Sequence, residues 1–248
     1  MVKFFPNNQR TPLFPILMYH NCPADFHDQL EYIARERRLQ PVHLSDEEVK
    51  RYLLGQESES PKGKIILTFD DGYQDFYEHA RHIIQDFNCK ATLCVATGGI
   101  AEKDRLEPAW TEGKGPLMIW DELRQLRGLK TREGENLLEF LPHSVNHPSF
   151  NDSDLIMIEG EIRDSKKSLS EKLEIPASTI EFFCLPGGTG EGKYEIQELL
   201  QNNDFLGALR AHAQKNYGWS QYSVPRCEPR NVQHLRQLLE ETNGFECD

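Results

Sequence analysis

The chain of 248 residues lacks any continuous apolar run of the roughly 18 residues that a membrane-spanning helix needs. It also lacks an excess of positive charge, because 40 acidic residues against 28 lysines and arginines give a net charge of -12. Proteins that bind nucleic acids use basic surfaces, so this balance argues against that class. With 38% hydrophobic residues, the composition is that of an ordinary soluble globular protein.

The N-terminal stretch "MVKFFPNNQRTPLFPILMYH" lacks the uninterrupted apolar segment of a signal peptide, because prolines and asparagines break it up. The cysteines lack CxxC spacing, and they fit free thiols at least as well as a disulfide framework. These features favour the cytoplasm, and the alternative is a secreted protein expressed without its leader, which would look the same. The cysteines are Cys22, Cys89, Cys94, Cys184, Cys227 and Cys247.

Strand-like and helix-like patterns alternate along the chain, whose length fits one domain spanning 1–248. Apolar stretches predict strands at 15–20, 64–69, 91–97, 136–143, 180–185 and 205–211. Helical spacing predicts helices at 25–38, 73–88, 155–173 and 193–203, a short helix that Asp121 caps, and a last helix around Leu235. In the long helix, Leu155, Ile158 and Ile162 begin the apolar stripe. This alternation predicts parallel strands covered by helices, in either a barrel or an open sheet.

Two adjacent acids, Asp70 and Asp71, follow the apolar strand "KIILTF" and precede Gly72. Like charges at this range are unfavourable unless something compensates them. In α/β barrels the carboxyl ends of the strands carry the active site, which favours a functional pair. The alternative is that one acid caps the next helix while the other is solvated.

Two histidines, His143 and His147, lie four residues apart in "LPHSVNHPS", between Pro142 and Pro148. The prolines favour a tight turn over a helix interior. Two surface histidines are one interpretation of this spacing. Combined with an Asp from another strand end, however, the pair supplies three ligands and leaves positions open, as in a catalytic metal site.

A glycine-rich segment, "FFCLPGGTGEG", covers residues 182–192. Its consecutive backbone N–H groups can hold an oxyanion, and a plain strand-to-helix loop is the alternative. It is not a phosphate-binding P-loop, because no GK[ST] follows.

Together and in this order, these segments resemble the polysaccharide deacetylases of carbohydrate esterase family 4. "TFDDG" is similar to the family's first motif and "HSVNHP" to its second, and "PILMYH", "IWDEL" and "SVPR" fall where a subgroup has comparable segments. The resemblance implies a distorted (β/α) barrel that removes N-acetyl groups from an amino sugar or a polysaccharide. It also implies that Asp71, His143 and His147 bind one divalent metal ion, zinc or else cobalt, nickel or iron. Asp70 would then be the catalytic base, and the oxyanion would rest on the metal and on a backbone N–H near Gly187.

Three features depart from the family pattern, and two of them concern catalytic residues. The third motif commonly has an arginine that orients the base, but here Cys184 and Leu185 stand around that position. Arg226 in "VPR" is either its replacement or an ordinary surface arginine. The late Leu-x-His motif that carries the general acid is also missing after residue 226. We expect His20, at the end of the first strand, to be the acid rather than His234, although a core histidine is an alternative for His20.

The substrate is only partly defined by these residues. Gly187 stands where an aromatic residue is common in the family, which would widen the pocket. Tyr73 and the tryptophans either stack on sugar rings or pack in the core; the tryptophans are Trp110, Trp120 and Trp219. An N-acetylated carbohydrate is the expected partner. Hydrolysis of a non-sugar amide and a carbohydrate-binding protein without turnover are the two alternatives.

Overall fold

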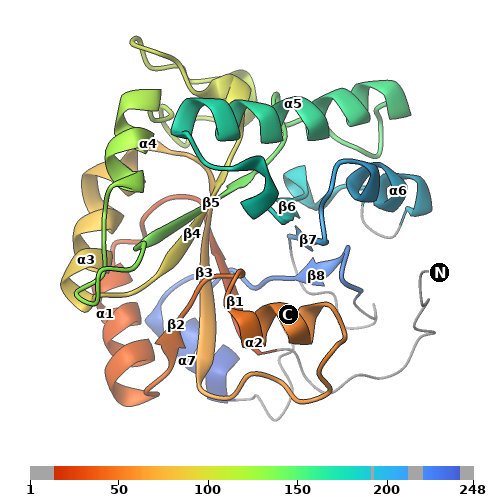
Figure 1. The fold of residues 1–248 in the computed structure, drawn as a ribbon. Helices are drawn as coiled ribbons and strands as arrows, with labels where there is room; N and C mark the ends of the chain where they lie inside the picture. Colours follow the sequence, from red (N-terminus) through yellow and green to blue (C-terminus); the bar gives the residue numbers. More distant parts are fainter. Residues whose placement is uncertain (1–13, 191–192, 212–219, 241–248) are drawn as a thin grey trace.

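The computed structural model describes residues 14–190, 193–211 and 220–240, and their strands form two parallel sheets (Figure 1). The first sheet has the order β1-β3-β4-β5, with β2 also paired to β3, and the second has the order β6-β7-β8. The strands of the first sheet are β1 (Ile16–Tyr19), β2 (Gln40–Pro41), β3 (Lys64–Asp71), β4 (Ala91–Val95) and β5 (Leu138–Pro142). Those of the second are β6 (Phe182–Cys184), β7 (Gly207–Arg210) and β8 (Val224–Pro225).

The two sheets make a distorted barrel, as expected. Just after β8, the Cys227 amide donates to the Ile16 carbonyl at 2.9 Å and the Met18 amide donates to the Cys227 carbonyl at 2.8 Å. These bonds join the end of the second sheet to β1. β5 and β6 are close neighbours but share no strand pairing, so the ring is open there.

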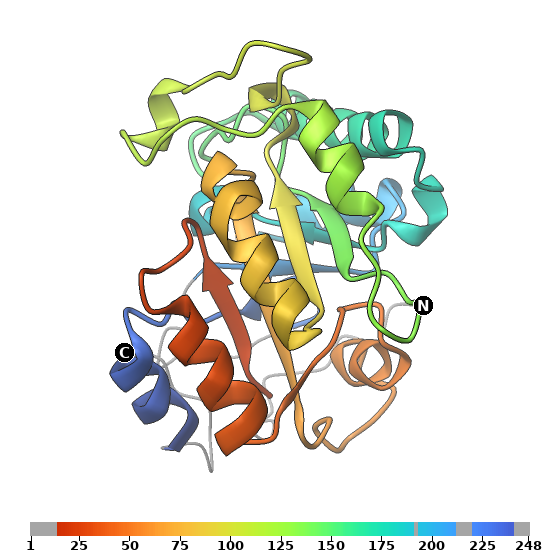
Figure 2. The same ribbon diagram turned by 90° about the vertical axis from the view of Figure 1, so that its left-hand side faces the viewer.

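Helices cover the outside of the strands. Figure 2 shows α1, α3 and α4 lying across the outer face of the first sheet. The helices are α1 (Phe26–Glu31), α2 (Glu47–Leu53), α3 (Arg81–Phe87), α4 (Trp120–Arg127), α5 (Leu155–Leu173), α6 (Tyr194–Asn202) and α7 (Val232–Glu240), and π-helical segments extend α1 (Tyr32–Glu36) and precede α3 (Phe76–Ala80). Among the described residues, none of these helices has the length and apolar character needed to span a membrane.

The central strand β3 is buried on both faces, as expected for a parallel strand between two layers. Ile65, Leu67 and Phe69 belong to the core between sheet and helices, whereas Ile66 belongs to the second core, inside the barrel. Side chains alternate along a strand, so Asp70 follows Ile66 on the inner side. The alternation of side chains along β3 therefore directs Asp70 into the barrel, at the carboxyl ends of the strands.

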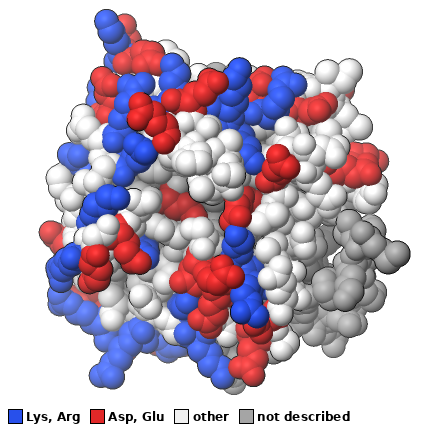
Figure 3. Space-filling model, in the orientation of Figure 1, with Lys and Arg blue, Asp and Glu red and all other residues white. Residues whose placement is uncertain are grey.

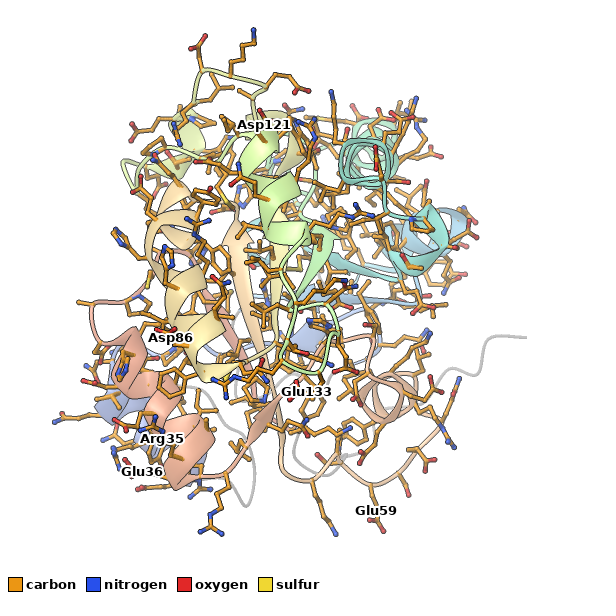
Figure 4. The ribbon with its side chains drawn as sticks, turned by 60° about the vertical axis from the view of Figure 1, so that its left-hand side comes forward. Arg35, Glu36, Glu59, Asp86, Asp121 and Glu133 are labelled. Carbon is orange, nitrogen blue, oxygen red and sulfur yellow. A yellow bond between two sulfur atoms is a disulfide. The ribbon has the colours of Figure 1, made fainter. Side chains whose placement is uncertain are left out.

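Most predicted elements are confirmed, with three differences. The strands β2 and β8 were not predicted, because each has only two residues and is too short for a periodic sequence pattern. Leu155 is not part of the buried stripe of α5, since it is 48% exposed at the first turn. Asp121 does not cap α4, because it lies inside the first turn and pairs with Arg124, while Glu122 accepts from the Ile119 amide (Figure 4).

Gly207 offers a test of the packing between the strands of the second sheet. A methyl group at this position would lie 2.5 Å from the Gln221 carbonyl oxygen and 2.9 Å from the Phe182 ring. Overpacking of this kind is expected to lower the free energy of unfolding of Gly207→Ala by about 1–3 kcal/mol, measured by chemical denaturation. Gly160→Ala in α5 is the control, because nothing lies within 4 Å of the added atom. Helix propensity predicts that the control is stabilised by ~1 kcal/mol. A Gly207→Ala variant as stable as the wild type would contradict this packing.

Candidate active site

The candidate site lies at the carboxyl ends of β3 and β5. Asp70 and Asp71 are the last residues of β3, and His143 follows β5 directly. Parallel pairing sets Asp71 opposite Val95 of β4 and Val95 opposite Pro142 of β5, so the three strand ends lie level. Asp70, Asp71 and His143 are all buried. The fold thus brings together residues that are about 70 positions apart in the sequence.

Asp71, His143 and His147 form one cluster of side chains that could donate ligand atoms to a metal ion, the donor cluster. Asp71 Oδ1 lies 3.4 Å from His143 Nε2 and 3.5 Å from His147 Nε2. Among the described residues this buried oxygen has no hydrogen-bond partner. A buried carboxylate oxygen without a partner is costly, and a divalent cation between the three atoms would satisfy it. One carboxylate and two imidazoles are also a donor set that leaves coordination positions free, so the residues fit a catalytic metal ion.

A hydrogen bond orients His143, and burial shifts the pKa of His147. His143 Nδ1 donates to the Cys184 carbonyl at 2.9 Å, which leaves its Nε2 facing Asp71. Such a bond to the outer ring nitrogen fixes the orientation of a metal-binding imidazole. Burial, followed by the nearby His143, lowers the pKa of His147 to about 4.

Arg226 forms a bidentate ion pair with Asp70, with Nη1 2.6 Å from Oδ1 and Nη2 2.7 Å from Oδ2. The arginine is fully buried, so the interpretation as an ordinary surface arginine is wrong. It also donates to the Thr68 hydroxyl at 3.0 Å and to the Arg210 carbonyl at 3.1 Å. Burial raises the pKa of Asp70, but the charges of Arg226 and His143 outweigh it and lower the value to about 2. Asp70 is therefore an ionised carboxylate.

His20 lies at the carboxyl end of β1 on the same rim, with 24% of its side chain exposed. Its Nδ1 hydrogen-bonds Glu228 Oε1 at 3.1 Å. Burial lowers the pKa of His20, but this hydrogen bond and the charges of Asp70 and Asp71 raise it above the ordinary value. His234 instead lies in α7, where its ring accepts from the Arg230 amide. Of the two histidines, only His20 is placed near the acids.

Gly187 reaches the site, because a Cβ built on it would lie 3.9 Å from His147 Cε1. Its φ of +56° suits glycine. Tyr73 is 1% exposed and belongs to the core, so the expectation that it stacks on a sugar is wrong. Its hydroxyl is buried, and burial and the Asp71 charge raise its pKa. Trp120 is also a core residue, and Trp219 lies outside the described residues.

Trp110 stacks on His147, with 4.8 Å between the ring centroids and 20° between the planes. It comes from the loop between β4 and α4. A partly buried ring in this place covers one side of the donor cluster.

Two cysteines near the site are paired. Cys94 of β4 and Cys184 of β6 form a disulfide, and Cys227 is also disulfide-bonded, whereas Cys22 and Cys89 are free. The sequence left free thiols and disulfides both open, and the structure contains both. The cytoplasmic location stays a prediction, although disulfides are more typical of oxidising compartments.

Glu161 is a site residue that the sequence reasoning missed. Its Oε2 accepts from the backbone amides of Val145 and Asn146 at 2.7 and 2.8 Å, and its Oε1 accepts from the Asn146 side chain at 2.7 Å. It thereby holds the turn between the two histidines, in which Ser144 and His147 have positive φ. The helical pattern could have indicated it, because Glu161 is a charged residue at a buried position of an amphipathic helix, between Ile158 and Ile162.

Removing the Glu161 carboxylate is expected to weaken metal binding. Glu161→Ala frees the turn, and loss of such a supporting partner costs roughly 10- to 100-fold in metal affinity. Glu161→Gln keeps one acceptor oxygen and should fall between Ala and the wild type. Chelator competition with zinc measures the affinity, and Glu159→Gln, exposed on the same helix, is the control. Equal affinity in Glu161→Ala and the wild type would refute the role.

Comparison with known proteins gives a family match and similar solved structures. The family model described as "Polysaccharide deacetylase" matches residues 57–203. The solved structure of the Streptococcus pyogenes deacetylase PplD in complex with acetate is similar, with a TM-score of 0.66, 24% identity, and coverage of 92% of this chain and 98% of that chain. IcaB from Ammonifex degensii gives a TM-score of 0.65 at 19% identity, covering 88% of this chain and 91% of that chain. These two likenesses support the fold.

Among curated proteins, YxkH of Bacillus subtilis (strain 168), whose name assigns it to the polysaccharide deacetylases, is 28% identical over 98 residues. That match spans 37% of this chain and 35% of the relative.

Proposed function

Since the chain belongs to the polysaccharide deacetylase family, we propose that it hydrolyses N-acetyl groups on an amino sugar or an N-acetylated polysaccharide. The observation that carries this proposal is the ionised Asp70, held by Arg226 next to the Asp71–His143–His147 donor cluster. A hydrolase needs a base beside an electrophile. A protein that only binds carbohydrate has no use for a buried, ionised carboxylate there.

The metal ion would be held by Asp71, His143 and His147, and zinc is our first choice, with cobalt, nickel and iron as alternatives. Two imidazoles and one carboxylate suit all of these ions. When bound, a divalent ion supplies Lewis acidity at the acetamide carbonyl and makes water more acidic.

Asp70 would accept the proton of the attacking water. Its low pKa keeps it ionised, and the two bonds from Arg226 fix its orientation. Arg226 thus takes the role that the family commonly gives to the third-motif arginine, which supports turnover over the alternative of a degenerate binder. Gly187 lies beside His147, and a backbone N–H near it would donate to the oxyanion.

His20 would donate the proton to the leaving amine. A general acid must be protonated before the reaction, and the raised pKa of His20 favours that state near neutral pH. Glu228 holds the imidazole in place through Nδ1, which leaves Nε2 for the proton transfer. Acetate and a free amino sugar are the products.

Asp70→Asn and His143→Ala are expected to separate catalysis from metal binding. Asp70→Asn keeps the donor cluster and should lose roughly 100-fold or more in acetate release, because a general base is worth that much. His143→Ala removes a ligand and should lose both metal and activity. Elemental analysis of the purified proteins and acetate release from N-acetylglucosamine oligomers measure the two properties.

The stability of Asp70→Asn is checked in parallel, because the substitution leaves the buried Arg226 without its counter-charge. A folded Asp70→Asn enzyme with normal turnover would remove Asp70 as the base. Acetate release from non-sugar amides, with none from the oligomers, would favour the alternative substrate class.

Glu228→Gln tests the acid through its pH dependence. The Glu228 carboxylate raises the pKa of His20, so its removal lowers that pKa. Activity that needs protonated His20 is lost as the pH rises through this pKa, and the loss should therefore begin at a lower pH in Glu228→Gln. The pH profile of kcat/KM measures it, with Glu133→Gln at the opposite end of β5 as the control (Figure 4). An unchanged alkaline limb would exclude His20 as the acid.

A further inference from the structure

A cavity of about 310 Å³ lies beside the donor cluster. Gly98 and Gly99, which follow β4, contribute to its lining together with Glu107, Trp110 and Asn146. Its volume is at the lower end of the range for small-ligand pockets, which fits one sugar unit better than a longer segment.

The cavity shares a wall with the donor cluster. Trp110 lines it and stacks its ring on His147, and Asn146, which also lines it, directly precedes that histidine. The Gly98 amide donates to the Val145 carbonyl at 2.8 Å, so the loop after β4 closes on the turn that carries the histidines. A Cβ at Gly98 would lie 2.8 Å from the same carbonyl oxygen, and only glycine permits this approach. A substrate chain with one unit at the cluster would therefore present its neighbouring unit to this cavity.

The charge of the cavity is negative. Glu107 is exposed at its edge and makes no ion pair with any residue in the described part of the chain. Its loop neighbours differ, since Glu102 pairs with Lys172 and Arg105 pairs with Glu122. In the part of the chain that the structure describes, no lysine or arginine lines the cavity, although both signs of charge gather on the surface over this loop (Figure 3). The carboxylate is therefore available to a ligand.

A carboxylate next to an aromatic wall is suited to an ammonium group. The carboxylate supplies a charge-assisted hydrogen bond to a cation. A neutral acetamide forms no such bond. Removal of an acetyl group from an amino sugar leaves an amine, which carries a positive charge when protonated.

We propose that this cavity binds a cationic amino-sugar unit next to the acetylated unit that is hydrolysed. The inference rests on the proposed function and deepens it, because it makes partially deacetylated chains the preferred substrates. Each hydrolysis then creates the group that the cavity recognises in a neighbouring unit.

Glu107→Gln tests the preference with two substrates, N-acetylglucosamine tetramers that are either fully acetylated or carry one free amine. The wild type should show the lower KM on the partially deacetylated tetramer. Glu107→Gln should raise that KM by about three- to fivefold, the value of one exposed ion pair, and leave the fully acetylated substrate unchanged. High salt should weaken the wild-type preference in the same way. Asp104→Asn, on the same loop but outside the cavity lining, is the matched control and should change neither KM.

A binding measurement separates this inference from the proposed function. Glucosamine tetramers without acetyl groups cannot be hydrolysed, and calorimetry should show weaker binding of them to Glu107→Gln than to the wild type and Asp104→Asn. Equal binding to all three proteins, or an equal change in both KM values, would overturn the cavity assignment while leaving the deacetylase proposal intact. Absence of acetate release from every substrate would instead contradict the proposed function, and the calorimetry would still decide whether the cavity takes a cationic sugar.

Discussion

The buried ion pair between Arg226 and Asp70 is the interaction on which the arrangement of the candidate site depends. Two charges removed from water are destabilising unless hydrogen bonds satisfy them. Here the guanidinium reaches both carboxylate oxygens, the Thr68 hydroxyl and the Arg210 carbonyl. These partners come from β3 and β7, while Arg226 follows β8, next to the bonds from Cys227 to β1. The packing that joins the two sheets therefore also fixes the ionised carboxylate.

The opposite side of the site lies at the gap between β5 and β6, where strand pairing is missing. The Cys184 carbonyl of β6 accepts from His143, and the Cys184 sulfur is bonded to Cys94 of β4. One residue thus connects the second sheet to the first by two routes and orients a proposed metal ligand at the same time. Glu161 adds a third support from α5, through the turn between the histidines. Contacts made by side chains of the site thus connect the two sheets where β5 and β6 are not paired.

Features formed by residues close together in the sequence could be predicted from it, whereas contacts between distant residues could not. Asp70, Asp71, His143 and His147 are recognisable because each pair lies within a few residues and ends an apolar strand. The burial of Arg226 was not predictable, because its partners lie 16 to 158 residues away and a short "VPR" segment has no periodic signal. The Cys94–Cys184 pairing spans 90 residues and is equally invisible to spacing. Leu155 was misplaced because helical periodicity does not show where a helix leaves the core.

The position of Arg226 explains why a missing motif residue need not mean a lost activity. In a barrel of parallel strands, every carboxyl end reaches the same rim, so a side chain from any strand end can approach the same carboxylate. Cys184 and Leu185, at the end of β6, stand around the position of the third-motif arginine, but Arg226, directly after β8, supplies a guanidinium that makes two hydrogen bonds to Asp70. Asp70 requires a positive charge at a fixed place in the fold, and the residue that supplies this charge can come from more than one position in the sequence. An inference of degeneracy from the third motif alone would therefore rest on sequence order, whereas the electrostatic requirement at Asp70 is met in space.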